Sequence, residues 1–144
     1  MKKKAEHSEQ LILDMLDAAA IVERRLDSAL SFSRGVSFSE YRLLRALQEA
    51  NQGLTRVALA QSLSVTPSGV TRALKPLEKL GYVATVRNER DARQSLATLT
   101  DGGATLLADV SDVLADCYAS LKLDQLSDSR LGAFEQVLVL LRSN

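Results

Sequence analysis

Apolar residues recur along the first thirty positions at steps of three and four, the spacing of one face of a helix. This stripe runs from Glu6 to about Ser31 and predicts a single long amphipathic helix. A helix of roughly 26 residues is long for a chain of this size, and such a helix usually packs against more than its own chain. The pattern therefore favours a dimer, with a long core helix inside a monomer as the alternative.

Three further helices are expected over the next fifty residues. The segment 40–50 places leucines on one face, and Arg56–Leu63 follows a threonine, a residue type that caps helix N-termini. A fourth helix opens at Thr66-Pro67, because threonine suits the N-cap and proline suits the first helical position. It continues until Gly81, which supplies the C-terminal cap.

The hydrophobic pattern then changes to one typical of strands. Residues 82–86 and 95–99 form β-branched and aromatic runs, and the eight polar residues 87–94 separate them, which predicts a two-stranded hairpin with a charged tip. A second long helix is expected around 106–121, and a last helix around 131–141. Two short helices joined by a tight turn and followed by a hairpin predict a mainly α fold, a winged helix-turn-helix with about six helices.

Composition narrows the function classes. One cysteine excludes an internal disulfide, and the single histidine, His7, removes most histidine-based hydrolases and HExxH metalloenzymes. With so few nitrogen and sulfur ligands, zinc sensing is not expected and His7 is expected to be solvated. We therefore expect no enzyme, no cofactor and no metal. No apolar run approaches the roughly 18 residues of a membrane span, so we expect a cytoplasmic protein without a membrane partner.

The net charge is zero, but its distribution is uneven. Residues 54–96 hold seven basic and three acidic side chains, a net charge of +4, whereas residues 97–144 hold three basic and seven acidic, a net charge of −4. A basic centre of this kind is the electrostatic footprint of a protein that binds a polyanion. It contains the predicted helix-turn-helix and wing, which favours double-stranded DNA. A winged helix used only for protein contacts is the alternative, and a loss of salt dependence would reveal it.

The fourth predicted helix has one apolar face and one small, polar and basic face. Val70, Leu74 and Leu77 fall at i, i+4 and i+7 and are expected to pack inward. The opposite face suits the major groove, since small residues allow close approach and Arg72 can reach base edges. An ordinary solvated face would carry the same charges, but the neighbouring helix and wing favour DNA. The candidate contacts are Thr66, Ser68, Gly69, Thr71, Arg72 and Lys75.

The predicted hairpin tip carries Arg87, Arg90 and Arg93, interleaved with Glu89 and Asp91. An arginine at the end of a wing can enter the minor groove, whose narrow walls focus negative potential. The carboxylates are then expected to orient the guanidinium groups. A solvated charged turn is the alternative.

The central part of the chain resembles the MarR (multiple antibiotic resistance regulator) family. The resemblance rests on residues 54–83, LTRVALAQSLSVTPSGVTRALKPLEKLGYV, with Leu-Ala in the third helix and Leu-Glu-x-x-Gly at the end of the fourth. It also rests on the wing sequence Asp91-Ala92-Arg93, followed by Leu99-Thr100 and then Gly103. The order of helices and wing is similar to that family over nearly the whole chain.

The resemblance implies a homodimeric transcriptional regulator, by default a repressor. Residues 1–36 and 101–144 would form a dimerisation domain of interlocked helices, and residues 37–100 would form the DNA-binding lobe. Paired recognition helices would enter successive major grooves of a pseudo-palindromic operator. In such proteins the arginine matching Arg93 enters the minor groove, and the aspartate matching Asp91 helps to position it.

Pro76 departs from the family pattern, because it lies inside the recognition helix where members commonly carry a polar or charged residue. Proline removes the hydrogen bond to the Arg72 carbonyl and is expected to kink the helix, which would affect the docking of Lys75 more than that of Arg72. A kink at the solvent face would instead be tolerated.

The resemblance also implies that a small aromatic or phenolic effector releases the protein from DNA. Phe32, Phe38 and Tyr41 cluster near the junction of the first two helices, where such a cleft would lie, although plain hinge core would use the same residues. An oxidant sensor acting through Cys117 is a further alternative. Cys117 shares an apolar stripe with Leu114 and Leu121, which instead predicts an inert buried thiol.

Overall fold

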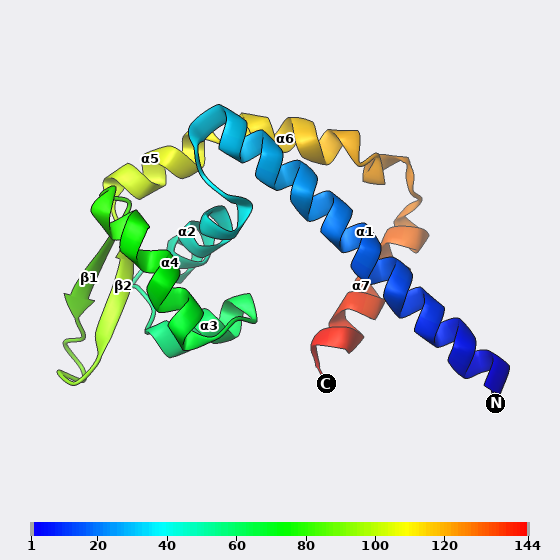
Figure 1. The fold of residues 1–144 in the computed structure, drawn as a ribbon, viewed down its shortest axis with the longest axis horizontal. Helices are drawn as coiled ribbons and strands as arrows, with labels where there is room; N and C mark the ends of the chain where they lie inside the picture. Colours follow the sequence, from blue (N-terminus) through cyan, green and yellow to red (C-terminus); the bar gives the residue numbers. More distant parts are fainter. Residues whose placement is uncertain (1, 144) are drawn as a thin grey trace.

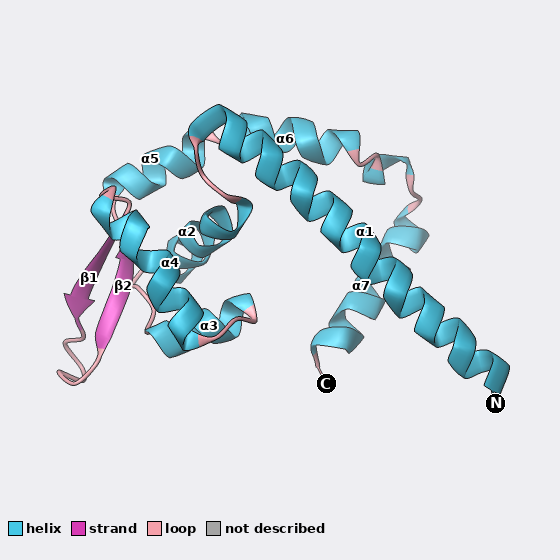
Figure 2. Ribbon diagram, viewed as in Figure 1, coloured by secondary structure: helices cyan, strands magenta, loops and turns pink. Residues whose placement is uncertain are grey.

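The computed structural model describes residues 2–143 and confirms a mainly α winged helix-turn-helix (Figure 1 and Figure 2). Within the described residues, no helix is both long enough and apolar enough to cross a membrane. The elements are α1 (Lys2–Arg34), α2 (Phe38–Ala50), α3 (Arg56–Leu63), α4 (Pro67–Lys79), β1 (Val83–Arg87), β2 (Ser95–Leu99), α5 (Asp101–Asp109), α6 (Ser111–Ser120), the 3₁₀ helix η1 (Leu123–Gln125) and α7 (Asp128–Arg142).

The first helix is longer than the apolar stripe predicts. α1 has 33 residues, and the additional residues 3–5 and 32–34 are exposed. Hydrophobic spacing indicates only the part of a helix that packs, so these exposed ends leave no mark in the pattern. The helix ends at Gly35, which has φ +66° and donates its amide to the Ser31 carbonyl at 3.1 Å.

Serine and threonine caps start the four consecutive helices α2 to α5. α2 begins at Phe38, two residues earlier than expected, because Ser37 and Glu40 form a capping box. The Ser37 hydroxyl accepts the Glu40 amide at 3.1 Å, and the Glu40 carboxylate accepts the Ser37 amide at 2.8 Å. In α3, α4 and α5 a threonine side chain accepts the amide three residues ahead; these caps are Thr55, Thr66 and Thr100.

Helix α4 matches its expected segment to within one residue and passes through Pro76. Gly81 ends it with φ +79°, and its amide donates to the Glu78 carbonyl at 3.0 Å. Pro76 lies on the exposed side of the helix, which continues to Lys79. The structure therefore supports the alternative in which Pro76 falls at the solvent face.

The wing is a two-stranded antiparallel hairpin in which Arg87 lies opposite Ser95. Leu54, in the linker before α3, adds a bridge to Ala97 through two backbone hydrogen bonds of 3.0 and 2.8 Å. Gly53 permits this approach, because it has φ +86° and a Cβ atom there would lie 2.7 Å from a threonine methyl of β2. The base of the wing is thus attached to the helical lobe.

The long helix expected around 106–121 is divided into α5 and α6 at Val110, which has φ −90° and ψ −6°. Backbone hydrogen bonds from Val110 to Leu106 and from Leu114 to Val110 continue across this junction. α5 packs on α2 and β2, whereas α6 packs on α1. The break therefore follows from packing against two different parts of the molecule, since no glycine or proline marks it.

One apolar core joins α1, the lobe, the wing base and the α5–α6 run. α7 has no buried residue, and the first half of α1 extends past the lobe (Figure 1). These two helices expose a set of large apolar side chains, which includes Leu11, Ile12, Leu16, Phe134, Val137 and Val139.

Candidate nucleic-acid interface

Helix α4 separates a buried face from a charged one. Val70, Leu74 and Leu77 are each 1% exposed, which confirms the predicted inward face. Arg72 and Lys75 are exposed on the other side of the helix. These three buried side chains hold α4 against the rest of the fold. Arg72 and Lys75 are therefore presented at a defined place on the surface.

The first turn of α4 is small and polar. The Thr66 hydroxyl accepts the Gly69 amide at 3.1 Å and lies 3.2 Å from the Ser68 hydroxyl. Thr71 is half-buried, and its hydroxyl donates a hydrogen bond to the Pro67 carbonyl at 3.1 Å. The hydroxyl hydrogen of Thr71 is therefore used within α4. Ser68 is exposed, and Gly69 adds no side chain in front of the helix. A partner could therefore approach the backbone of this turn closely.

The wing tip exposes three arginines, Arg87, Arg90 and Arg93. Asp91 is half-buried, and its carboxylate accepts the backbone amide of Arg93 at 3.0 Å. The Asn88 side chain accepts the Arg90 amide in the same way, also at 3.0 Å. The expectation that a carboxylate orients a guanidinium therefore takes another form here: Asp91 shapes the backbone turn that presents Arg93.

Among the described residues, no ion pair neutralises the positive charge of these surfaces. Across the described residues, the ion pair within 4.0 Å is Arg45–Glu49, on the surface of α2. The cations of α4 and of the wing tip, which include Arg72 and Arg93, have no carboxylate partner there within that distance. They remain available to a polyanion.

Two side-chain contacts that sequence reasoning missed tie the wing to the helices. Arg56, at the start of α3, donates Nη1 to the Ser95 hydroxyl at 2.9 Å. The Thr85 hydroxyl on β1 donates to the Glu78 carboxylate on α4. The residues of the first pair lie 39 positions apart, so no local spacing could have indicated that contact.

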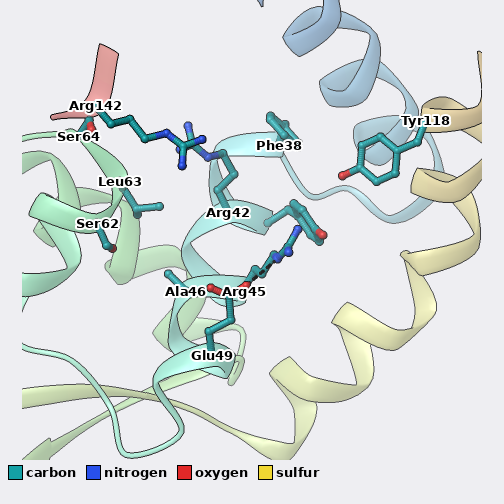
Figure 3. Close-up of a pocket in the computed structure, with 11 residues that line it drawn as sticks. Phe38, Arg42, Arg45, Ala46, Glu49, Ser62, Leu63, Ser64, Tyr118 and Arg142 are labelled. Atoms are coloured by element: carbon teal, nitrogen blue, oxygen red, sulfur yellow. Dashed lines mark hydrogen bonds and ion pairs between the residues drawn. The ribbon is translucent and has the colours of Figure 1, made fainter. Parts of the chain in front are cut away.

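A second candidate site is a pocket of about 530 Å³ between α2, α3, α6 and the end of α7 (Figure 3). The rings of Phe38 and Tyr41 stack at 5.8 Å between centroids on one wall. Phe32 does not join them, because it is 96% exposed and lies outside the pocket. The polar lining includes Arg42, Arg45, Glu49, Tyr118 and Arg142.

The pKa of two groups in this pocket is raised. Partial burial, and next to it the neighbouring Tyr41, raises the pKa of the Tyr118 hydroxyl. The hydrogen bond to Glu49 at 3.0 Å raises the pKa of Arg45. Tyr118 was not predicted from the sequence, where it looks like one more residue of an amphipathic helix.

The remaining candidates, Cys117 and His7, are not among the residues that line the pocket. Cys117 is half-buried against the apolar core, and His7 is exposed on α1. Among the residues that the structure describes, no cluster of three or more histidine, cysteine and carboxylate side chains could hold a metal ion.

Several known proteins are similar to this chain in sequence or in fold. A sequence profile of the MarR family matches residues 34–94. An HTH-type transcriptional repressor of Mycobacterium tuberculosis is 34% identical over 87 residues, which are 60% of this chain and only 61% of the relative's length. A MarR family transcriptional regulator from Streptomyces coelicolor, solved in complex with DNA, has a TM-score of 0.84 and 27% identity over 94% of this chain and 86% of that chain.

The same fold occurs at lower identity. CouR from Rhodococcus jostii, solved with p-coumaroyl-CoA, has a TM-score of 0.83 and 18% identity over 94% of this chain and 93% of that chain. At this identity the similarity concerns the arrangement of the helices and the wing.

Proposed function

The chain belongs to the MarR family of winged-helix regulators, and from this premise we propose that it is a homodimeric repressor of transcription. The observation that carries the proposal is the set of exposed cations on α4 and on the wing that form no ion pair among the described residues. Both the M. tuberculosis relative, named a repressor, and the S. coelicolor regulator bound to DNA support it. The proposal places the protein in the cytoplasm with its operator.

In this proposal α4 enters the major groove and the wing enters the minor groove. Arg72 reads base edges, and Lys75 contacts the backbone phosphates. Thr66, Ser68, Gly69 and Thr71 allow the first turn of α4 to approach the bases. Arg93 inserts into the minor groove, where narrow walls strengthen its attraction, while Arg87 and Arg90 contact the flanking phosphates.

We assign residues 1–36 and 101–144 to dimerisation and residues 37–100 to the DNA-binding lobe. The apolar side chains that α1 and α7 expose, such as Leu16 and Val137, support this division, since a monomer would leave them in water. A second copy of the chain would cover them and place two α4 helices on one face of the duplex. A symmetric dimer of this kind reads a pseudo-palindromic operator.

The direct test is titration of the full-length protein against its own upstream DNA at several salt concentrations. We expect saturation at two chains per operator, a steep loss of affinity with salt, and resistance to competing random duplex. Equal, weak binding to both duplexes would contradict the proposal. It would instead favour a winged helix that contacts proteins.

We further propose that the pocket between α2, α3 and α6 holds an aromatic acid that releases the protein from DNA. The stacked Phe38 and Tyr41 offer a flat apolar wall, and the pocket volume of about 530 Å³ suits a small ligand. Three arginines against one glutamate leave an excess of positive charge, which favours a carboxylate. The pocket lies between the lobe and the dimerisation helices, so its occupant would alter the placement of α4.

The effector proposal predicts different outcomes for two aromatic residues. Tyr118→Ala is expected to weaken binding of cinnamate or benzoate by about 1–2 kcal/mol, because it removes a ring and a hydroxyl donor from the pocket. Phe32→Ala removes an exposed ring outside the pocket and is the matched control. Calorimetric titration of both variants, with the neutral amides as comparison ligands, checks this. Equal affinities for wild type and Tyr118→Ala would place the ligand elsewhere.

A further inference from the structure

We infer that the hydrogen bond between Arg56 and Ser95 positions the wing, and so determines how effectively Arg93 reaches DNA. This inference rests on the proposed DNA-binding function and concerns residues outside the expected contact set. Arg56 and Ser95 are assigned as positioning residues, because they act through Arg93.

The contact lies at the point where the wing leaves the body of the lobe. Arg56 is the first residue of α3, and its Nη1 donates to the Ser95 hydroxyl at 2.9 Å. Ser95 is the first residue of β2 and lies opposite Arg87, the last residue of β1. Arg93 is two residues before Ser95, so the bond fixes the strand immediately next to the tip.

The tip beyond Ser95 is held only by short-range contacts among the described residues. The Asn88 amide donates to the Gln94 carbonyl at 3.0 Å, and Arg87 Nε donates to the Ala92 carbonyl at 3.2 Å. Such contacts preserve the shape of the tip, but they join the tip only to itself. The orientation of the tip relative to α4 must therefore come from contacts lower in the hairpin.

Two other hydrogen-bonded contacts join the strands to the helices, together with the burial of Val83 and Ala97 in the core, and all of these lie farther from the tip. The backbone bridge from Leu54 reaches Ala97, two residues beyond Ser95 along β2. The Glu78 carboxylate binds Thr85, two residues before the end of β1. Without the Arg56 contact, Ser95 and Arg87 would form an unsupported end of a two-stranded ribbon. Ribbons of only two strands are weakly stable by themselves.

A mobile wing would lower affinity for DNA through entropy. Each free wing must be ordered when Arg93 enters the minor groove, and this ordering subtracts from the binding free energy. A wing already held by Arg56 avoids that cost. The effect of Ser95 should consequently disappear once Arg93 is absent, which separates positioning from a direct contact or a general loss of stability.

The test is a double-mutant cycle on a duplex selected by the wild-type protein from a random library. Ser95→Ala is expected to weaken binding about threefold to tenfold, the usual range for one lost hydrogen bond. In the Arg93→Ala background the same change should alter binding less than about twofold, because the group that it positions is gone. Ser95→Thr keeps the hydroxyl and should restore wild-type affinity. Ser111→Ala, a change remote from the wing, is the control.

Several outcomes would overturn the inference. Equal losses from Ser95→Ala with and without Arg93, or no loss at all, would show that Ser95 does not act through Arg93. If Arg56→Ala reduces the slope of log K against log salt by about one per half-site, which is about two for the proposed dimer, Arg56 itself contacts a phosphate. An unchanged slope with reduced affinity supports positioning.

Hydrogen exchange of the free protein separates this inference from the proposed function. The Asn88 amide donates to the Gln94 carbonyl next to the Arg87–Ser95 pair, and it should exchange faster in Ser95→Ala if this end of the ribbon opens more often. Unchanged exchange in the variant would overturn the inference. Failure of the wild-type protein to select any duplex would contradict the proposed function, while the exchange result would still decide whether Arg56 holds the wing.

Discussion

Replacing Arg72 with alanine is expected to weaken specific DNA binding by about 1–3 kcal/mol at each half-site and to relax sequence preference there. Arg72 is exposed on α4 directly opposite the buried face formed by Val70 and Leu74. A guanidinium at this place can make two hydrogen bonds to a guanine edge, and alanine can make none. The proposed dimer would carry the change twice, so the total loss would be up to twice that at one half-site. Titration against operators with single-base changes measures both effects.

Lys79→Ala is the matched control for Arg72→Ala. Lys79 is exposed on the same helix but in its last turn, away from the end expected to enter the groove. A phosphate contact carries no sequence information, so its loss should weaken all duplexes alike and reduce the salt slope by at most about one per half-site, or about two for the proposed dimer. If Arg72→Ala also weakened every duplex equally, Arg72 would be a phosphate contact and base reading would lie elsewhere on α4.

Gly103→Ala is expected to lower the free energy of unfolding by about 3 kcal/mol, as overpacking of a closed site does. A Cβ atom at Gly103 would lie 2.5 Å from Leu99 Cδ1 and would also press on the Tyr82 carbonyl. That carbonyl accepts the Thr100 amide at 3.1 Å, so it cannot withdraw without breaking the junction between the wing and α5. Urea denaturation at constant protein concentration measures the change.

Gly132→Ala supplies the comparison for Gly103→Ala within the same chain. Gly132 lies inside α7, and apart from its own neighbours and helix backbone no described atom of the chain lies within 4 Å of the position that its Cβ would take. Alanine favours the helix there, so stability should rise by up to about 1 kcal/mol. A similar gain from both substitutions would show that helix propensity, and not the close approach of Tyr82 and Leu99, governs Gly103.

The candidate interface was largely predictable from sequence because its determinants are local. The alternation of apolar and polar residues in α4 identifies which side packs inward, and the exposure of Arg72 and Lys75 agrees with it. The exposed Arg87, Arg90 and Arg93 likewise follow from a polar stretch between two strand patterns. The role of Asp91 was less accessible, since its bond to a backbone amide depends on the conformation of the turn.

The pocket was only half predictable. Phe38 and Tyr41 lie three residues apart on one helix, so helical spacing alone brings their rings together. Phe32 lies on a different helix, and its direction depends on how α1 crosses α2; the structure turns it into solvent. Tyr118 and Arg142 reach the pocket from elements far along the chain, and no local pattern could include them.

The sequence by itself determined the caps at Thr55, Thr66 and Gly81, the limits of α3 and α4, and the pairing of the wing strands. These features depend on interactions within a few residues, such as the Thr66 hydroxyl with the Gly69 amide. The tertiary structure decided the break at Val110, the bond from Arg56 to Ser95, and the residues that meet in the pocket. Each of these joins elements distant in sequence, where packing of whole faces outweighs local preference and the pattern along the chain carries no trace of the contact.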